Sequence, residues 1–346
     1  MNCKRIGLDL AKNVFQLHGV DNNDQVVLTR KLKRTDMKFF FAQLPPCEVA
    51  MESCATSHYW ARCLQSYGHQ VKLLAAQHVK PYLQGGKNDA NDAAAICEAA
   101  SRPHMKYVGV KNETQQTIQL VHRTRTVAIR ARTALANEIR STLAEFGILC
   151  DRSGIHITRQ TLMQAIHDSN NIWPEPLRSL WQLQAKRLDD LNEQIEQLDN
   201  MLKQHALTET KVKQLMQVEG VGLITASAIA CAVPDISQFK NGREFAAWLG
   251  LTPRQNSSGG KTRLGHITKR GDTYLRYLLV HGARTVVQHC KNKLDYQSLW
   301  IQSLLLRRPS NVVVVAMANK TARIIWAMLS AGADYRKPSL VGIEAS

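Results

Sequence analysis

The first 75 residues consist of short apolar runs separated by turn signals, and this pattern restricts the fold more than any other feature. Asp21-Asn22-Asn23-Asp24 predicts a turn between two strands, and Pro45-Pro46 ends a helix. The predicted strands are residues 4–9, 14–20, 25–32, 47–53 and 70–75, and the predicted helices are 35–44 and 57–67. Three strands followed by alternating helices and strands predict a mixed sheet flanked by helices.

Helical periodicity dominates after residue 112. The predicted helical segments are 113–146, 177–203, 214–232, 243–250, 273–290, 296–306 and 310–331. A loop rich in Ser, Gly and Lys, 253–271, interrupts them. We therefore expect an α/β domain at 1–112, a helical linker and coiled coil at 113–210, and a helical domain at 211–346.

Residues 177–203 carry an apolar heptad repeat. Its positions are Trp181, Gln184, Leu188, Leu191, Ile195, Leu198 and Leu202. Steps of three and four residues are typical of a coiled coil, here interrupted once by Gln184. A dimer interface is the preferred interpretation, and a helical hairpin within one subunit is the alternative.

The charge of the chain predicts a polyanionic partner. The 346 residues carry a net charge of +17, and the segments 1–150, 151–239 and 240–346 carry +8, −3 and +12. Nucleic acid is the first expectation and an anionic membrane the second. The longest aliphatic run, 312–316, is too short to span a bilayer, and the start of the chain does not resemble a signal peptide. Eight scattered cysteines argue against zinc and disulfides and fit a reducing cytoplasm.

Four carboxylates in the first hundred residues predict a metal site. Asp9 and Glu52 each end an apolar run, and Asp89 and Asp92 share one face at the start of an Ala-rich helix, in Lys87-Asn88-Asp89-Ala90-Asn91-Asp92. Oxygen ligands suit Mg²⁺, with Mn²⁺ as a substitute, and divalent cations assist phosphoryl transfer. The alternative is a helix N-cap role for Asp89 and a solvated Asp92.

Two further features point to nucleic acid. Gly220-Val221-Gly222 lies between apolar helical segments and is typical of a helix-hairpin-helix, in which backbone N–H groups approach phosphate, although such turns also serve packing. The helix at 113–146 is basic on one side, through Arg123, Arg125, Arg130, Arg132 and Arg140. This side is either a solvated face or one that contacts phosphate, and we select Arg123 and Arg130 as contacts.

Three N-terminal motifs, Gly7-Leu8-Asp9, Met51-Glu52-Ser53-Cys54 and 87–93, occur in order with a C-terminal stretch, 248–271. Together they resemble the DEDD transposases of the insertion-sequence 110 family, 1111-like branch, over essentially the whole chain. The resemblance implies an RNase-H-like (Holliday-resolvase-like) N-terminal domain, a coiled coil and a helical C-terminal transposase domain. It also implies recombination guided by a structured RNA that pairs with donor and target DNA.

The resemblance also implies a catalytic serine, which we match to Ser258 because it directly precedes a glycine; Ser257 is the adjacent alternative. A serine in a Gly-rich loop is free to attack phosphate. Basic residues around it could stabilise the developing charge, namely Lys261, Arg263, Lys269 and Arg270. Without the resemblance, a flexible polar linker is the preferred interpretation.

Three functions remain. The first is a recombinase that uses Mg²⁺ and a serine, works as a dimer or tetramer, and acts at the nucleoid in bacterial cytoplasm. The second is a junction resolvase or RNase-H-like nuclease that hydrolyses without a serine intermediate. The third is a non-catalytic nucleic-acid-binding protein. Ser258 distinguishes the first two, because hydrolysis does not need it, and the four acids argue against the third, because binding alone gains nothing from them.

Overall fold

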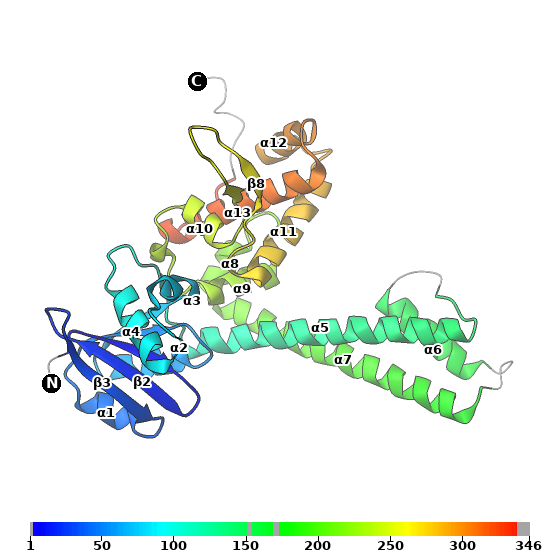
Figure 1. Cartoon of the computed structure of the whole chain (residues 1–346). Helices are drawn as coiled ribbons and strands as arrows, with labels where there is room; N and C mark the ends of the chain where they lie inside the picture. Colours follow the sequence, from blue (N-terminus) through cyan, green and yellow to red (C-terminus); the bar gives the residue numbers. More distant parts are fainter. Residues whose placement is uncertain (1–2, 87, 151–153, 169–172, 338–346) are drawn as a thin grey trace, which may run out of the picture. The chain divides into compact units, whose positions relative to one another are not determined.

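The computed structural model describes residues 3–86, 88–150, 154–168 and 173–337 (Figure 1). Lys87 of the acidic motif and the first two residues of the chain lie outside these ranges. The chain forms two compact units. The first comprises residues 1–115 together with 233–240, and the second comprises 116–232 together with 241–346.

The first unit is built on a mixed sheet, as predicted. Its strands are β1 (Arg5–Leu10), β2 (Val14–Val20), β3 (Val26–Lys33), β4 (Glu48–Glu52), β5 (Gln70–Leu74) and β6 (Tyr107–Val108). They lie in the order β3-β2-β1-β4-β5-β6. The first three strands form an antiparallel meander, and β1, β4 and β5 run parallel. The two-residue β6 is too short to give a periodic signal and was not predicted.

Helices cover both faces of this sheet. They are α1 (Met37–Gln43), α2 (Ser57–Ser66), α3 (Ala76–Val79), η1 (Lys80–Tyr82) and α4 (Asp89–Ala100). Met51 of β4 is buried in one cluster with Trp60 of α2. The preceding residue, Ala50, is buried in a second cluster with Ile96 of α4. Because successive side chains of a strand point to opposite faces, α2 and α4 lie on opposite sides of the sheet.

Three long helices fill part of the second unit: α5 (Glu113–Glu145), α6 (Ile155–His167) and α7 (Glu175–Thr208). The helix α6 was not predicted. Leu188 of the heptad is fully buried in one cluster with Ile139 of α5 and Leu162 of α6. Across the same seam, the Gln184 amide donates to Glu138 at 3.0 Å.

The heptad seam is therefore filled by helices of the same chain, and α5 and α7 lie side by side (Figure 1). This corrects our preferred interpretation of the heptad as a dimer interface. The spacing identified the buried face of α7 correctly, but the partner of that face is α5 and α6 within one subunit, as in the hairpin alternative.

The remaining helices of the second unit are α8 (Thr210–Leu215), α9 (Leu223–Ala232), α10 (Gly242–Trp248), α11 (Thr273–Gln288), α12 (Tyr296–Leu305) and α13 (Ser310–Ala331). The short η2 (Ile236–Gln238) belongs to the first unit. By length and composition α13 could cross a membrane. Here it packs against α10, α11 and α12, with Val313, Met317 and Ile325 buried, as in the core helix of a globular domain.

A buried histidine joins three of these helices. The ring nitrogens of His122 on α5 lie 3.1 Å from the Tyr274 hydroxyl on α11 and 3.1 Å from the Ser227 hydroxyl on α9. Burial, aided by the nearby Arg125 charge, lowers the pKa of His122 to about 4. The ring is therefore neutral at physiological pH, which lets one nitrogen donate while the other accepts.

Candidate functional site

Two of the four predicted acids lie at neighbouring strand ends. Asp9 is the penultimate residue of β1, and Glu52 is the last residue of β4. These strands are parallel, and Leu8 pairs with Met51. The next residue on each strand is therefore an acid, so Asp9 and Glu52 are brought together by the register of the sheet.

The third acid, Asp92, reaches the same place from α4. Asp9, Glu52 and Asp92 line a cavity of about 300 Å³, together with Cys54, Ala76, Val79, Lys80 and others. Gly7 allows this approach, because a Cβ on it would lie 2.1 Å from the Ala93 carbonyl oxygen. The Arg5 guanidinium also donates to the Cys97 carbonyl at 3.0 Å, which fixes α4 against β1.

Asp89 is placed differently from the other three acids. It is exposed at the first turn of α4 and is not among the residues that line the cavity. The N-cap of α4 is Asn88, whose side chain accepts from the Asn91 backbone at 2.8 Å. The N-cap alternative for Asp89 is therefore wrong, and its carboxylate remains free of that role.

The other three acids act on the ionisation of Asp9. Partial burial raises the pKa of Asp9 to about 6, with further contributions from Asp92, Asp89 and Glu52 in that order. Three carboxylates disfavour ionisation of a fourth because negative charge accumulates in this site. A bound divalent cation would relieve this repulsion.

The donor set suits a hard cation, because the acids present oxygen ligands alone. Among the described residues, no three His, Cys, Asp or Glu side chains stand close enough to enclose a metal ion. Side-chain rotation of Asp9, Glu52 and Asp92 toward the shared cavity would be needed for coordination. The three acids nevertheless fit a divalent cation, because they present oxygen ligands and line one cavity.

Sequence reasoning missed Lys80, a cation that lines the acidic cavity from η1. Within the described part of the chain its ammonium forms no ion pair with the acids. A lysine at the rim of an acidic cavity can contact a phosphate that approaches the acids. Nothing in the spacing around Lys80 distinguished it from other surface lysines.

Ser258 lies at the tip of a β-hairpin in the second unit. The strands are β7 (Pro253–Gln255) and β8 (Leu264–Ile267), which correct our prediction of a loop and of a flexible linker. Gly259 and Gly260 have φ of 54° and 75°, and the Lys261 backbone N–H donates to the Ser258 carbonyl at 3.1 Å. Two successive residues in the left-handed region are typical of a type I′ turn, which favours glycine at both positions.

The two candidate serines differ in their hydrogen bonds. The Ser257 hydroxyl accepts from the Gln255 amide at 3.0 Å and from the Arg263 backbone N–H at 3.4 Å. The Ser258 hydroxyl has no partner within the described residues and is exposed. Ser257 thus helps to hold the hairpin together, while the oxygen of Ser258 is available to a substrate.

The base of the hairpin is fixed by a buried arginine that sequence reasoning also missed. One Arg276 nitrogen donates to the Leu249 carbonyl at 3.1 Å and to the Arg270 carbonyl at 2.9 Å. Gly271 makes a similarly close contact, since a Cβ on it would lie 1.9 Å from the Trp248 carbonyl oxygen. These contacts hold the backbone that carries Lys269 and Arg270, while both side chains are exposed, as are Lys261 and Arg263 near the tip.

The remaining predicted contacts divide into two groups. Gly220 faces α11, where a Cβ would lie 2.9 Å from the Gly282 carbonyl oxygen, so it serves packing, whereas Gly222 is exposed with nothing within 4 Å. On α5, Arg125, Arg132 and Arg140 bond to Asp199, Asn192 and Thr158. Arg123 and Arg130 are exposed and free of such bonds in the described chain.

Comparison with known proteins gives consistent results for both units. A family model for DEDD transposases of the IS110 type matches residues 6–148, which include all four acids. A second model, described as Transposase IS116/IS110/IS902 family, matches residues 212–297, which include the hairpin.

Three curated relatives are similar over nearly the whole chain. A probable family 20 transposase of Pseudomonas aeruginosa is 53% identical over 97% of this chain and 99% of the relative. The transposase for insertion sequence element IS1111A of Coxiella burnetii is 40% identical over 96% and 91%. The transposase for insertion sequence element IS1328 of Yersinia enterocolitica is 40% identical over 97% and 99%.

Proposed function

Since the chain belongs to the IS110 family of insertion-sequence transposases, which cut and rejoin DNA, we propose that its acids hold Mg²⁺ and that Ser258 is the nucleophile. The observation that carries this proposal is the convergence of Asp9, Glu52 and Asp92 on one cavity from three separate elements. Membership of the DEDD family implies a divalent metal ion. We propose Mg²⁺, with Mn²⁺ as a substitute, because the donor set consists of oxygen atoms alone.

We further propose that the N-terminal unit is RNase-H-like. An antiparallel meander joined to two parallel strands, in the order β3-β2-β1-β4-β5, supports this assignment. So do the acids at the carboxyl ends of adjacent parallel strands, which is where side chains from two strands meet at one edge. Asp89, on the exposed first turn of α4, completes the four acids.

At the acidic cavity, Asp9, Glu52 and Asp92 would hold the cation through their carboxylate oxygens. When bound, Mg²⁺ neutralises phosphate charge and favours deprotonation of the attacking group. Lys80 at the rim contacts a non-bridging phosphate oxygen and keeps the DNA backbone from being repelled by the acids.

At the hairpin, the Ser258 oxygen attacks the phosphorus of a DNA phosphodiester. A bond forms between that oxygen and phosphorus, the bond to one sugar oxygen breaks, and the serine proton leaves to a base while the sugar oxygen gains one. Lys261 and Arg263 contact the charged phosphate, and Lys269 and Arg270 bind the adjoining backbone. The phosphoserine link conserves the energy of the broken bond, so rejoining needs no ATP.

We propose a structured non-coding RNA as guide, with donor and target DNA as substrates. The net charge of +17 and the exposed Arg123, Arg130 and Gly222 support polyanion binding beyond the cleavage site. We place the protein in the bacterial cytoplasm at the nucleoid, and we propose a dimer or tetramer as the active assembly. The heptad seam does not contribute to that assembly.

The test is strand cleavage by matched charge variants. Asp9→Asn and Asp92→Asn should abolish cleavage of a DNA substrate in Mg²⁺, while RNA binding is retained. Glu98→Gln, on the same helix as Asp92 but in a surface pair with Arg102, should cleave normally and controls for loss of charge on α4. Full cleavage by Asp9→Asn would refute the metal site, and loss in Glu98→Gln would assign the effect to α4 in general.

A further inference from the structure

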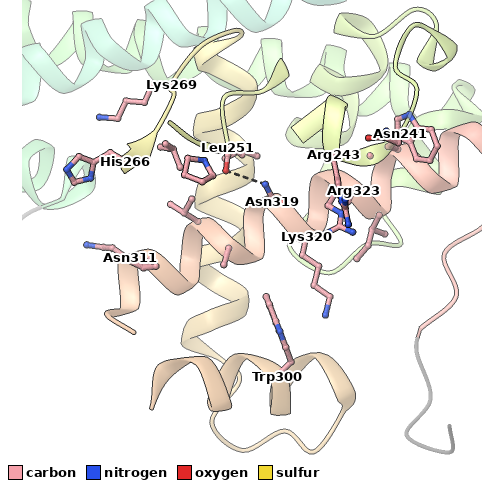
Figure 2. Close-up of a pocket in the computed structure, with 18 of the residues that line it drawn as sticks. Asn241, Arg243, Leu251, His266, Lys269, Trp300, Asn311, Asn319, Lys320 and Arg323 are labelled. Carbon is pink, nitrogen blue, oxygen red and sulfur yellow. Dashed lines mark hydrogen bonds between the residues drawn. The ribbon is translucent and has the colours of Figure 1, made fainter. Parts of the chain in front are cut away.

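The second unit contains an open groove of about 1360 Å³, and of its lining residues only Lys269 has a part in the proposed chemistry. It is formed by α10, α12, α13 and the base of the hairpin (Figure 2). Pockets for drug-sized ligands span roughly 300–1000 Å³. The groove is larger than this range, and because it is open to solvent it can receive a segment of an extended polymer.

The lining combines an apolar floor with cations. The floor includes Val312, Val315, Ala316, Ile324 and Ala327. The cations are Arg243, Lys269, Lys320 and Arg323, and the lining residues include no carboxylate. None of the four cations forms an ion pair within the described part of the chain. The groove therefore presents uncompensated positive charge beside apolar surface.

An aromatic ring of the groove lies beside one of these cations. The Lys320 ammonium lies 4.2 Å from the centroid of the Trp300 ring and points toward it from α13 (Figure 2). Burial lowers the pKa of Lys320, and the adjacent Arg323 charge adds to the effect. A cation in this environment gains from any anion that enters, and the indole ring offers a flat surface beside it.

A polymer with regular anionic groups and flat apolar rings matches this combination. Single-stranded nucleic acid exposes both phosphates and base faces, whereas a duplex hides its base faces by stacking. The groove shares residues with the hairpin base, Pro253, His266 and Lys269. A strand in the groove would thus continue toward Ser258, which favours the DNA strand that is cut over RNA.

We propose that the groove binds an unpaired segment of the cleaved DNA strand, with a base against Trp300 and phosphates against Lys320 and Arg323. The choice of DNA rests on the proposed function. Binding of single-stranded DNA itself does not depend on catalysis. The groove and the catalytic proposal can therefore fail separately.

The experiment measures affinity for a fluorescent single-stranded oligonucleotide and for the matching duplex, in a Ser258→Ala background that cannot form the proposed adduct. Trp300→Ala should weaken single-strand binding roughly tenfold, and Trp300→Phe should retain most of it. Lys320→Gln combined with Arg323→Gln should weaken it and lower the slope of log K against log salt by about 1.4, as expected for two lost phosphate contacts.

The matched control is Arg284→Gln combined with Lys291→Gln. It removes the same charge from exposed positions of the same unit that do not line the groove. We expect near-normal single-strand binding in this control and near-normal duplex binding in every variant. Equal effects of the control and groove pairs would overturn the proposal, as would loss of single-stranded RNA binding with DNA binding retained.

Cross-linking gives a second readout that does not depend on folding of a variant. An oligonucleotide that contains 5-iododeoxyuridine should, on irradiation of the Ser258→Ala protein, attach to a peptide that contains Trp300. Cross-links confined to other peptides would place the strand elsewhere and overturn the proposal. Failure of the catalytic proposal would show instead as absence of a serine adduct, with cross-linking unchanged.

Discussion

A Cβ placed on Gly7 would lie 2.1 Å from the carbonyl oxygen of Ala93, so β1 and α4 are in direct backbone contact at this point. Asp9 follows Gly7 by two residues, and Asp92 immediately precedes Ala93. The contact therefore sets the distance between two of the acids that line the cavity. It also explains why a glycine occupies the middle of a buried strand, where it is otherwise unfavourable.

Gly7→Ala should force α4 away from the sheet. We expect destabilisation of about 1–3 kcal/mol, as for other overpacked cores, and at least tenfold slower cleavage because Asp92 moves from Asp9. Gly86→Ala is the control, since a Cβ there meets nothing within 4 Å. Thermal unfolding and cleavage rates measure the two effects; wild-type cleavage by a folded Gly7→Ala protein would show that the contact does not position the acids.

Asp9 predicts a pH dependence of metal binding. Folding raises the pKa of Asp9 from 3.8 to about 6. Between pH 3.8 and pH 6 the Asp9 carboxyl is therefore protonated in the folded protein and ionised in the unfolded chain. Ionisation above pH 6 therefore opposes folding of the metal-free protein, and this penalty disappears below about pH 4. At high pH, bound Mg²⁺ should offset the destabilisation that ionised Asp9 causes. Below pH 6, Mg²⁺ should compete poorly with the proton on the Asp9 carboxyl.

The measurement is the melting temperature at pH 5 to 8, with and without Mg²⁺. We expect Mg²⁺ to stabilise the wild type at pH 8 and to have little effect at pH 5. Asp9→Asn should melt higher than metal-free wild type at pH 8 and should not respond to Mg²⁺. If Mg²⁺ raises the melting temperature equally at pH 5 and at pH 8, ionisation of Asp9 is not coupled to metal binding.

The heptad offers a matched pair on one helix. Leu188 is 0% exposed, within a cluster that includes α5 and α6, whereas Leu183 on the same helix is 65% exposed. Leu188→Asp should destabilise the helical pair by several kcal/mol, because it buries a charge without a partner. Leu183→Asp should leave the fold intact.

Light scattering and thermal unfolding of both variants test this assignment. We predict a lower melting temperature for Leu188→Asp and an unchanged one for Leu183→Asp. A well-folded Leu188→Asp protein with reduced mass would restore the dimer interpretation of the seam.

Much of the fold could be predicted because buried faces leave a period in the sequence. The strands from Arg5 to Leu74 and the helices α5 and α7 follow that period closely, whereas α6 was not predicted. The hairpin at 253–267 left no such signal, since both of its strands are largely exposed and neither alternates apolar with polar residues. The α7 heptad showed which face is buried, but spacing alone does not tell whether the partner belongs to the same chain.

The candidate site was predictable to a similar extent. The position of Asp9 and Glu52 at the ends of apolar runs indicates that they share one site, because parallel strands end at the same edge of a sheet. The difference between Ser257 and Ser258 depends on hydrogen bonds across the hairpin, and the role of Arg276 depends on carbonyl groups at Leu249 and Arg270. Such contacts join positions that the sequence does not mark as neighbours.

The central claim is that Ser258 forms a covalent link to DNA phosphate, and trapping that link tests it most directly. The reaction is quenched with denaturant on a nicked substrate that cannot be rejoined, and peptides that span 255–261 are examined by mass spectrometry for attached nucleotide. We predict an adduct on Ser258 in the wild type, its loss in Ser258→Ala, and its retention in a folded Ser257→Ala protein. An adduct of undiminished yield in Ser258→Ala, or cleavage with no protein–DNA adduct at all, would contradict the account.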